Sequence, residues 1–192
     1  MVVIRAASAA DAAQVAAVMR ASWLAAYADI IAPALLERAT SPDGGERIRQ
    51  SFWTRPWQHM LAATDSQRAC PAGTGRPSIV GYATFGPELD VLDQSWPYPR
   101  TAAGSAGEVA ELYALYVHPG WWSTGTGREL MTTVLGAVRD GGYTAITLWV
   151  LAANTRARRF YQRAGFAADG ARHELPDLGG VTEVRYRRAL EP

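Results

Sequence analysis

The residue types best suited to chemistry gather in a glycine-containing loop in the second half of the chain. The loop reads Ser123-Thr124-Gly125-Thr126-Gly127 and follows an apolar stretch, residues 109–117, and a His118-Pro119-Gly120 turn. An amphipathic run that ends near Val138 comes directly after it, so we expect the loop to open a helix. A helix start presents unpaired backbone N–H groups and the positive end of the helix dipole. The sequence therefore predicts a site for a phosphate or pyrophosphate.

Two familiar phosphate-binding loops do not fit this segment. A Walker loop has Lys and then Ser or Thr after its second glycine, whereas Gly125 is followed by Thr126 and Gly127. A dinucleotide fingerprint has a small residue three positions after its second glycine, where this chain has Leu130. ATP and NAD are therefore disfavoured as ligands. A plain strand–turn–helix connection is the alternative interpretation.

A second block of residues supports a functional interpretation of the loop. Residues 144–151 alternate apolar side chains in the manner of a largely buried strand. Asn154 then stands at a natural N-cap position, and a short helix with Tyr161 on its apolar face follows. Gly165 is suited to end that helix in a left-handed conformation. Arg156, Arg158 and Arg159 are interpreted as the solvated face of this helix, with contact to a phosphate group of the ligand as the alternative.

Together the two blocks resemble the GNAT acetyltransferase superfamily. Its acetyl-CoA motif is written Q/R-x-x-G-x-G/A, and here Trp122, Gly125 and Gly127 occupy the fixed positions. Trp122 departs from the consensus, which removes a side-chain donor and leaves the backbone amides to bind. The second block of the superfamily is matched by four residues: Asn154, Tyr161, Gly165 and Phe166. The resemblance covers roughly residues 2–188, with its specific motifs within 109–166.

The resemblance implies a fold and a co-substrate, acetyl-CoA. The fold is α/β (α+β): a mixed, mostly antiparallel sheet of six to seven strands, helices on both faces and a central parallel β–α–β unit. A V-shaped opening between the two central strands would admit the pantetheine arm of CoA. By resemblance, backbone groups of Leu115, Tyr116 and Val117 and the residue Asn154 would contact that arm. The loop that would wrap the pyrophosphate consists of Trp122, Ser123, Thr124, Gly125, Thr126, Gly127 and Arg128.

Two residues are predicted to take part in catalysis. Glu111 lies fourteen residues before Gly125, where well-studied members of the superfamily place a catalytic glutamate. A base there would offset part of the roughly 4–5 kcal/mol needed to deprotonate an alkyl amine at neutral pH. Tyr161 is the proposed acid for the departing thiolate, and it would act by donating a hydrogen bond without fully releasing its proton. The alternatives are a solvated strand carboxylate for Glu111 and a core aromatic for Tyr161.

The sequence predicts the residues that would bind the acceptor amine less specifically than those that would bind the acetyl donor. In this superfamily it meets the first helices, the loop after them and the late hairpin, here roughly 22–58, 86–107 and 170–182. Trp23, Tyr27 and Asp29 are our candidates, because aromatic and carboxylate side chains suit an amine-bearing small molecule. A protein lysine or N-terminal amine is the alternative acceptor. A non-catalytic acyl-CoA sensor is the alternative of another class, and a homodimer is left open.

Composition excludes other classes of protein. The formal net charge of +1 gives no support for a nucleic-acid or anionic-membrane partner. The single cysteine, Cys70, cannot form an internal disulfide, and the three histidines lack metal-ligand spacing, so no metal is expected. No apolar run is long enough to span a bilayer, and the first residues do not resemble a cleavable signal. We therefore expect one cytoplasmic domain over residues 1–192.

The remaining elements follow from periodicity and breakers. We expect a strand at 2–6, a helix from a Ser8 cap to about residue 20, and two helical pieces within 22–39 separated before Pro33. Strands are expected at 57–63, 78–85 and 181–190. A loop at 64–77 and an insertion at 86–107 would connect the middle strands.

Overall fold

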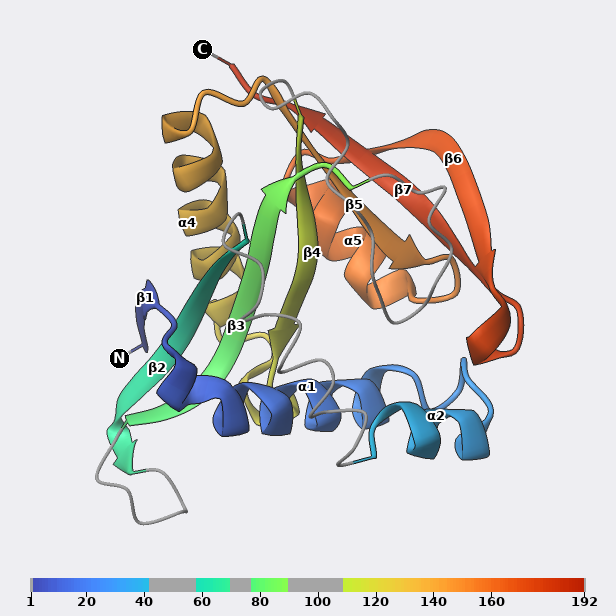
Figure 1. The fold of residues 1–192 in the computed structure, drawn as a ribbon, viewed down its shortest axis with the longest axis horizontal. Helices are drawn as coiled ribbons and strands as arrows, with labels where there is room; N and C mark the ends of the chain where they lie inside the picture. Colours follow the sequence, from blue (N-terminus) through green and yellow to red (C-terminus); the bar gives the residue numbers. More distant parts are fainter. Residues whose placement is uncertain (1, 42–57, 70–76, 90–108, 192) are drawn as a thin grey trace.

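A computed structural model describes residues 2–41, 58–69, 77–89 and 109–191, although the side chains of 66–69 and 77 are not described. Seven strands form one sheet in the order β1-β2-β3-β4-β5-β7-β6 (Figure 1). The strands are β1 (Val2–Ala6), β2 (His59–Ala69), β3 (Pro77–Pro87), β4 (Val109–Val117), β5 (Ala145–Leu151), β6 (Ala167–Leu175) and β7 (Val181–Ala189). Every neighbouring pair is antiparallel except β4 and β5. The predicted fold class is confirmed.

In the described part of the chain, four α-helices cover the two faces of this sheet (Figure 1). They are α1 (Ala12–Ala26), α2 (Pro33–Ala39), α4 (Thr126–Asp140) and α5 (Thr155–Arg163). One buried cluster joins α4 and α5 to the strands, with Leu112, Ile146 and Tyr186 among its members. A second cluster joins α1 and α2 to Tyr82, Leu151 and other strand residues. We call the two sides of the sheet the α4 face and the α1 face.

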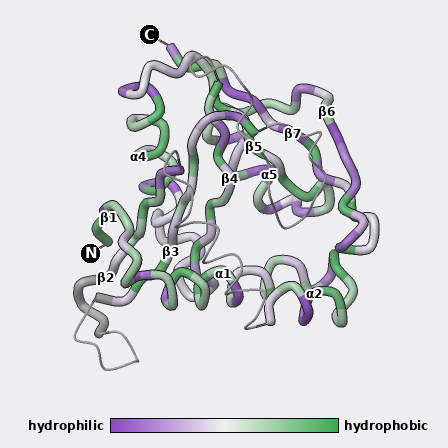
Figure 2. The backbone as a smooth tube through the Cα atoms, viewed as in Figure 1, coloured by the Kyte–Doolittle hydropathy of each residue, from purple (hydrophilic) through white to green (hydrophobic). Residues whose placement is uncertain are grey.

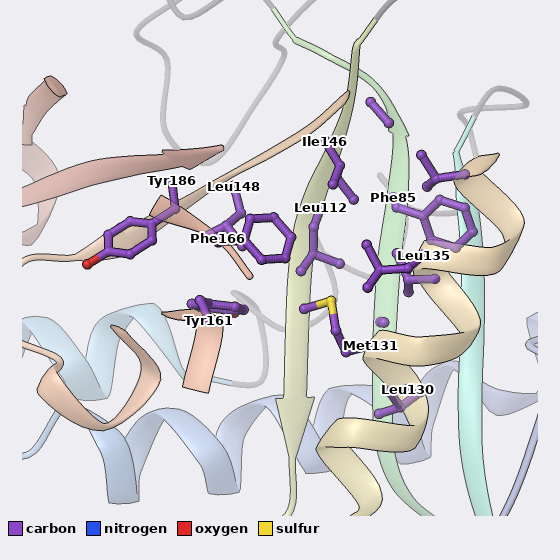
Figure 3. Packing of buried hydrophobic residues seen from close by; sticks show 14 of the residues in the cluster. Phe85, Leu112, Leu130, Met131, Leu135, Ile146, Leu148, Tyr161, Phe166 and Tyr186 are labelled. Carbon is purple, nitrogen blue, oxygen red and sulfur yellow. The ribbon is translucent and has the colours of Figure 1, made fainter. Parts of the chain in front are cut away.

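The α4 face carries the larger apolar core (Figure 3). Met131 and Leu135 lie one helical turn apart on α4 and point toward the sheet near Leu112 and Phe85, and Leu130 belongs to the same buried cluster. Figure 2 shows this amphipathic pattern as alternating green and purple along α4. Each large aliphatic side chain removed from water contributes about 1.5–3 kcal/mol, so this cluster anchors the helix that follows the glycine loop.

Several local predictions are confirmed. Pro33 stands in the first turn of α2, where its missing N–H costs nothing. Asp11 accepts from the Ser8 backbone N–H at 2.7 Å and also pairs with Arg5, so the start of the first helical segment is capped. Gly165 has φ +84 after α5, a conformation that glycine adopts without steric cost.

Three boundaries differ from the sequence prediction. α1 continues without a break from Ala12 to Ala26, where the sequence predicts one helix to end near residue 20 and another to begin at 22, and within it the Ser22 hydroxyl donates to the carbonyl of Val117 at 2.9 Å. The predicted loop at 64–77 is shorter, because Thr64 and Asp65 pair with Ile79 and Ser78. The predicted insertion also begins later, because Gly86 and Pro87 pair with β4. The rest of both segments, 70–76 and 90–107, lies outside the described residues.

The central parallel strands separate part-way along their length. β4 and β5 pair from Val109↔Ala145 to Leu112↔Leu148, whereas β4 continues to Val117 along β3 and β5 continues to Leu151 along β7. The register between β3 and β4 shifts at this point, since Thr84 pairs with Ala114 but Phe85 pairs with Leu112. Tyr113 is the extra residue of a bulge, which bends a strand locally. The expected opening is therefore present as a splay between β4 and β5, with α5 beside it (Figure 1).

Candidate active site

The backbone of β4 supplies polar groups along one side of the splay. The N–H of His118 donates to the carbonyl of Val80 at 2.8 Å, which makes this a hydrogen-bonded pair of the ladder. Because such pairs alternate along an antiparallel ladder, the backbone groups of Tyr116 face β3 while those of Leu115 and Val117 face the splay. Leu115 and Val117 thus direct their backbone groups into the splay and Tyr116 directs its own toward β3, while contact of any of the three with a pantetheine arm remains a prediction.

The end of β4 is fixed by two side-chain donors. The carbonyl of Val117 accepts from the Ser22 hydroxyl at 2.9 Å and from the Trp122 indole N–H at 2.7 Å. Trp122 therefore still supplies a donor, but it uses that donor to hold the loop against β4. Trp122, which replaces the Gln or Arg of the consensus motif, therefore makes a structural contact.

The glycine loop has the backbone conformation of an anion-binding helix start. Gly125 is the N-cap of α4 with φ +99, and Ser123 also has a positive φ of 64. The first helical bond joins the Glu129 N–H to the Gly125 carbonyl at 3.0 Å. The N–H groups of residues 126–128 precede that bond and have no acceptor within the helix, so they are available to an anion.

Threonine side chains brace this loop from inside. The Thr124 hydroxyl donates to the Trp121 carbonyl at 2.8 Å and lies 3.0 Å from the Thr126 hydroxyl. Thr126 is buried, whereas Ser123, Thr124 and Arg128 are exposed. The loop is consequently held in shape by its own side chains while its outer residues face solvent.

Gly127 is not required by the packing of the protein itself. A Cβ on this residue would lie 3.5 Å from Phe160 and 3.7 Å from Val117, which are ordinary contact distances. Its φ is not in the left-handed region either. A glycine here fits the close approach of a bound group to the backbone better than a demand of the fold.

Arg156 lies against this loop, next to residues that are predicted to bind phosphate. Its guanidinium stands 4.2 Å from the centre of the Trp122 ring, and its Nη2 lies 3.5 Å from the Ser123 hydroxyl. Arg158 instead donates to the Tyr186 hydroxyl and the Ala152 carbonyl, and Arg159 is exposed. The three arginines therefore have different surroundings, and Arg156 is the one beside the predicted phosphate site.

Asn154 caps α5 on the opposite side of the splay. Its side-chain oxygen accepts from the Ala157 N–H at 3.0 Å. This bond satisfies one of the unpaired donors of the helix and fixes the approach of α5 to the sheet. The capping role expected from the sequence is present. Contact with a CoA arm remains a prediction.

Glu111 is a buried residue of the central strand. It is 1 % exposed, and its Oε2 accepts from the Leu89 N–H at 3.0 Å. It pairs in register with Thr147, at the closed end of the splay. The alternative of a solvated strand carboxylate is therefore wrong. Its catalytic role remains a prediction.

Three tyrosines from separate elements meet at the splay. Tyr161 comes from α5, Tyr116 from β4 and Tyr27 from the residue after α1. Burial raises the pKa of Tyr161 well above its ordinary value, and the neighbouring Tyr116 and Glu183 raise it further. Burial also raises the pKa of Tyr27, with added effects from Tyr116, Tyr161 and Glu183. Both phenols stay protonated at neutral pH and are suited to donate hydrogen bonds.

Tyr161 has an aromatic setting as well as this polar one. Its ring lies 5.2 Å from Phe160 and 6.1 Å from Phe166, both in edge-to-face arrangements. Figure 3 shows Tyr161 and Phe166 on the same side as Leu148. The core interpretation and the functional interpretation of Tyr161 are thus compatible.

The candidate acceptor residues are distributed from core to surface. Trp23 is buried, and its ring lies 5.2 Å from Tyr27 and 6.4 Å from Tyr116. Asp29 is exposed in the turn between α1 and α2. Trp23 therefore packs against Tyr27 and Tyr116 from the core side. Tyr27 faces the splay, and Asp29 lies farther out.

The late strands β6 and β7 contribute a group of polar side chains. The sequence predicted the region in which they lie but not the individual residues. His173 Nε2 lies 3.4 Å from Glu183 Oε2, and the His173 ring meets Trp149 edge-on at 4.4 Å. Arg185 pairs with Asp169 at 2.7 Å and with Glu88 at 3.3 Å. Alternation of side chains along each strand was the only available signal, and it does not reveal which residues of different strands are neighbours.

Two absences apply to the described part of the chain. Within it, no group of three or more His, Cys, Asp and Glu side chains is arranged to hold a metal ion. None of its helices combines the length and the apolar character needed to cross a bilayer.

Comparison with known proteins agrees with this geometry. Residues 29–166 match the family model described as the acetyltransferase (GNAT) family. A relative from Mycobacterium bovis, named an uncharacterized N-acetyltransferase, is 34% identical over 111 residues, which is 57% of this chain and 59% of that protein. The match thus spans about three fifths of that relative. A mycothiol acetyltransferase of Beutenbergia cavernae is 30% identical over 67% of this chain and 47% of its own length.

Solved structures share the fold along the whole chain. The PaiA N-acetyltransferase from Thermoplasma acidophilum, solved in complex with coenzyme A, superposes with a TM-score of 0.68. It is 16% identical, with coverage of 98% of this chain and 99% of that one. At this identity the likeness concerns the fold alone.

Proposed function

Since this chain belongs to the GNAT acetyltransferase family, we propose that it is an N-acetyltransferase that moves an acetyl group from acetyl-CoA to a primary amine of a small molecule. The amine attacks the thioester directly while both substrates are bound. The naming of one relative as a mycothiol acetyltransferase provides a precedent for a small-molecule substrate.

One observation carries the proposal: the splay between β4 and β5 leads directly to the N-terminus of α4. An extended amide-bearing arm fits beside the outward backbone groups of Leu115 and the outward N–H of Val117, whose carbonyl already accepts from Ser22 and Trp122. A diphosphate fits the N–H groups of residues 126–128, with Arg156 beside them. The arm and the diphosphate are the two parts of CoA that such a site would bind, and the continuous run of residues 115–128 between the two proposed positions supports the proposal.

The chemistry that follows has two requirements. A thioester carbonyl under attack gains negative charge, which a backbone N–H facing the splay stabilises. The departing thiolate needs a hydrogen-bond donor, and the Tyr161 phenol is kept protonated by burial. Because its raised pKa makes full proton transfer to a thiolate unfavourable, Tyr161 acts here as a hydrogen-bond donor. Glu111, the base predicted from the sequence, has one carboxylate oxygen already occupied by the Leu89 N–H.

Calorimetry with CoA and thiol release from acetyl-CoA across a panel of amines test the proposal. We expect CoA to bind and at least one small primary amine to be acetylated. Turnover confined to peptide lysines or N-termini would favour a protein acceptor. Tight CoA binding without turnover on any amine would favour a sensor.

Two glycines of α4 provide a matched pair for the binding site. Gly127→Ala fills space at the first turn, and we expect CoA affinity to fall about tenfold or more, because the methyl group blocks the close approach of a phosphate. Gly136→Ala adds a methyl group in the middle of the helix, where nothing lies within 4 Å. It should leave CoA affinity unchanged and stabilise the helix by about 1 kcal/mol. Equal affinities in both variants would argue against a diphosphate at this loop.

A further inference from the structure

Glu183 and His173 form a pair on the α1 face that the proposed reaction has not yet used. They are direct cross-strand neighbours of β7 and β6, with Nε2 and Oε2 3.4 Å apart. Their side chains are 19 % and 32 % exposed, respectively. Both are thus sheltered from bulk water and still accessible to a small molecule.

The sheet places this pair beside the splay. Glu183 pairs in register with Leu151 at the end of β5, and Leu151 packs in the cluster under α1 and α2. On the outer side, the turn between β6 and β7 is joined to α2, where Arg38 donates to the Asp177 carbonyl at 2.9 Å. Figure 1 shows the β6–β7 hairpin reaching toward α2 at this corner. The pair therefore stands between β5 and the end of α1.

Electrostatic effects place the carboxylate near the reacting region. After burial and Tyr116, the charge of Glu183 is a further cause that raises the pKa of both Tyr27 and Tyr161. These two phenols reach the splay from opposite faces of the sheet. A carboxylate that acts on both lies close to the position where a thioester would enter between β4 and β5.

The surrounding charged groups leave Glu183 facing that region. Arg185, on the same face of β7, is held by Asp169 and by Glu88, which also accepts from Thr147. Among the described residues, His173 from β6 contacts Glu183, and the charge of Glu183 acts on Tyr27 after α1 and on Tyr161 from α5, two phenols that Tyr116 from β4 also influences. Trp149 and Leu151 face it from β5 and carry no charge. A cation that approaches this carboxylate would therefore be attracted to it and not repelled.

We propose that Glu183 receives the ammonium group of the acceptor and takes its proton, with His173 as the positioning residue that holds the carboxylate. This inference rests on the proposed acetyl transfer. The proton moves from nitrogen to the Glu183 carboxylate, and the freed lone pair forms the N–C bond as the C–S bond breaks. The sulfur leaves as a thiolate, and the second amine proton neutralises it. One amide and one thiol are formed, and the proton on Glu183 returns to solvent.

Glu183 fits this task better than Glu111. Glu111 is 1 % exposed, lies where β4 and β5 are still paired, and accepts from the Leu89 backbone. Glu183 lies beyond the paired segment. An acceptor with a primary ammonium and an apolar portion suits this setting, because Trp149 and the tyrosines border the carboxylate.

The test compares pH–rate profiles for the best small amine of the panel. For Glu183→Gln we expect kcat/KM to fall about 100-fold at pH 7, the scale of general-base catalysis. The deficit should shrink as pH rises toward the amine pKa of about 10.4, because more acceptor then arrives as free base. The KM for acetyl-CoA should not change. Glu174→Gln, an exposed neighbour on β6, is the matched control and should behave as the original protein.

His173 needs its own readout. His173→Phe should lower kcat/KM with the same pH dependence as Glu183→Gln, while His173→Gln should recover most of the activity because its amide N–H can still donate to Glu183. Failure of His173→Gln to recover activity would overturn the positioning role.

Two outcomes separate this inference from the proposed function. If the original protein acetylates an amine and Glu183→Gln does so equally well with an unchanged pH profile, only the role of Glu183 is overturned. A loss that is the same at every pH and accompanied by a lower melting temperature would also overturn it, since that pattern indicates structural damage. If the original protein acetylates no amine, the proposed function fails and this inference falls with it.

Discussion

The guanidinium of Arg156 lies 4.2 Å from the centre of the Trp122 ring and so joins α5 to the glycine loop across the splay. Trp122 in turn donates to the carbonyl of Val117 at 2.7 Å. One chain of contacts therefore links the end of β4, the loop that precedes α4 and the first turn of α5. The two sequence blocks that suggested acetyl-CoA meet in space through these side chains.

Arg156→Ala should weaken CoA binding about fivefold, because a positive charge beside the phosphate site is lost. An exposed ionic contact is worth up to about 1 kcal/mol, which corresponds to this factor. Calorimetry at low and at raised salt measures the change, and the difference between the two proteins should narrow as salt screens the charge. Arg159→Ala, exposed on the same helix, is the control. The same loss in both variants would indicate a general charge effect and not a site.

Tyr161→Phe should lower kcat at least tenfold while CoA affinity changes less than twofold. The phenol would stabilise charge that appears only as the thiolate leaves, so its removal affects the reaction more than binding. Because the pKa of Tyr161 is raised, the phenol should stay protonated at least up to its ordinary value of about 10. If the original protein loses activity at some pH below that value, ionisation of Tyr161 should not be the cause. Tyr161→Phe should therefore show the same loss at that pH. Tyr143→Phe, on the loop after α4, is the control, and equal losses in kcat and affinity for Tyr161→Phe would make Tyr161 a packing residue.

Asp11→Asn should destabilise the fold by about 1–2 kcal/mol at neutral pH. The Arg5 guanidinium pairs with this carboxylate at 2.7 Å, and the Ser8 N–H donates to it. Chiefly because of the Arg5 hydrogen bond, the pKa of Asp11 is held well below its ordinary value. A lowered native pKa stabilises the fold above about pH 4, the unfolded value, and this contribution is lost as pH falls.

Denaturant unfolding at several pH values checks this prediction. The stability gap between the original protein and Asp11→Asn should be full at pH 7 and should narrow steadily below pH 4. Asp140→Asn, exposed at the end of α4, should show no such gap. A gap of constant size down to pH 2 would show that the charge of Asp11 contributes nothing.

The features that the sequence predicts well are those determined within a few residues. Asn154 caps its helix through Ala157, three residues away, and Pro33 begins α2 by its fixed φ. The unbroken α1 could not be predicted this way, because Ser22 bonds to Val117, which lies 95 residues farther along the chain. Serine favours a cap when its hydroxyl has only local partners, and a distant partner changes that preference.

The same distinction applies to the candidate site. The loop around Gly125 and the short helix with Tyr161 form recognisable blocks because each is local. The pairing of His173 with Glu183 depends on the register of β6 against β7. That register shifts between Ala168 and Arg172. Alternation along each strand gives the face of a residue but not its neighbour on the next strand. The residues predicted for the acetyl donor therefore outnumber those predicted for the acceptor.

Glu111 allows the two candidate bases to be compared directly. Glu111→Gln keeps an oxygen that can accept from Leu89 and removes only the charge, so we expect kcat/KM at pH 7 to stay within about fivefold of the original protein. Glu111→Ala leaves the Leu89 N–H without this acceptor and creates a cavity in the centre of the sheet. Its cost should be about 2–4 kcal/mol of stability, seen as a lower melting temperature.

We thus expect changes at Glu111 to affect mainly stability and Glu183→Gln to affect mainly activity. A fall of about 100-fold in kcat/KM for Glu111→Gln, largest at low pH and with unchanged melting, would return the role of base to Glu111. The double variant Glu111→Gln/Glu183→Gln distinguishes a shared role from independent ones. If only Glu183 accepts the proton, the two substitutions should act independently. The kcat/KM of the double variant should then lie below that of Glu183→Gln only by the small factor that Glu111→Gln causes on its own.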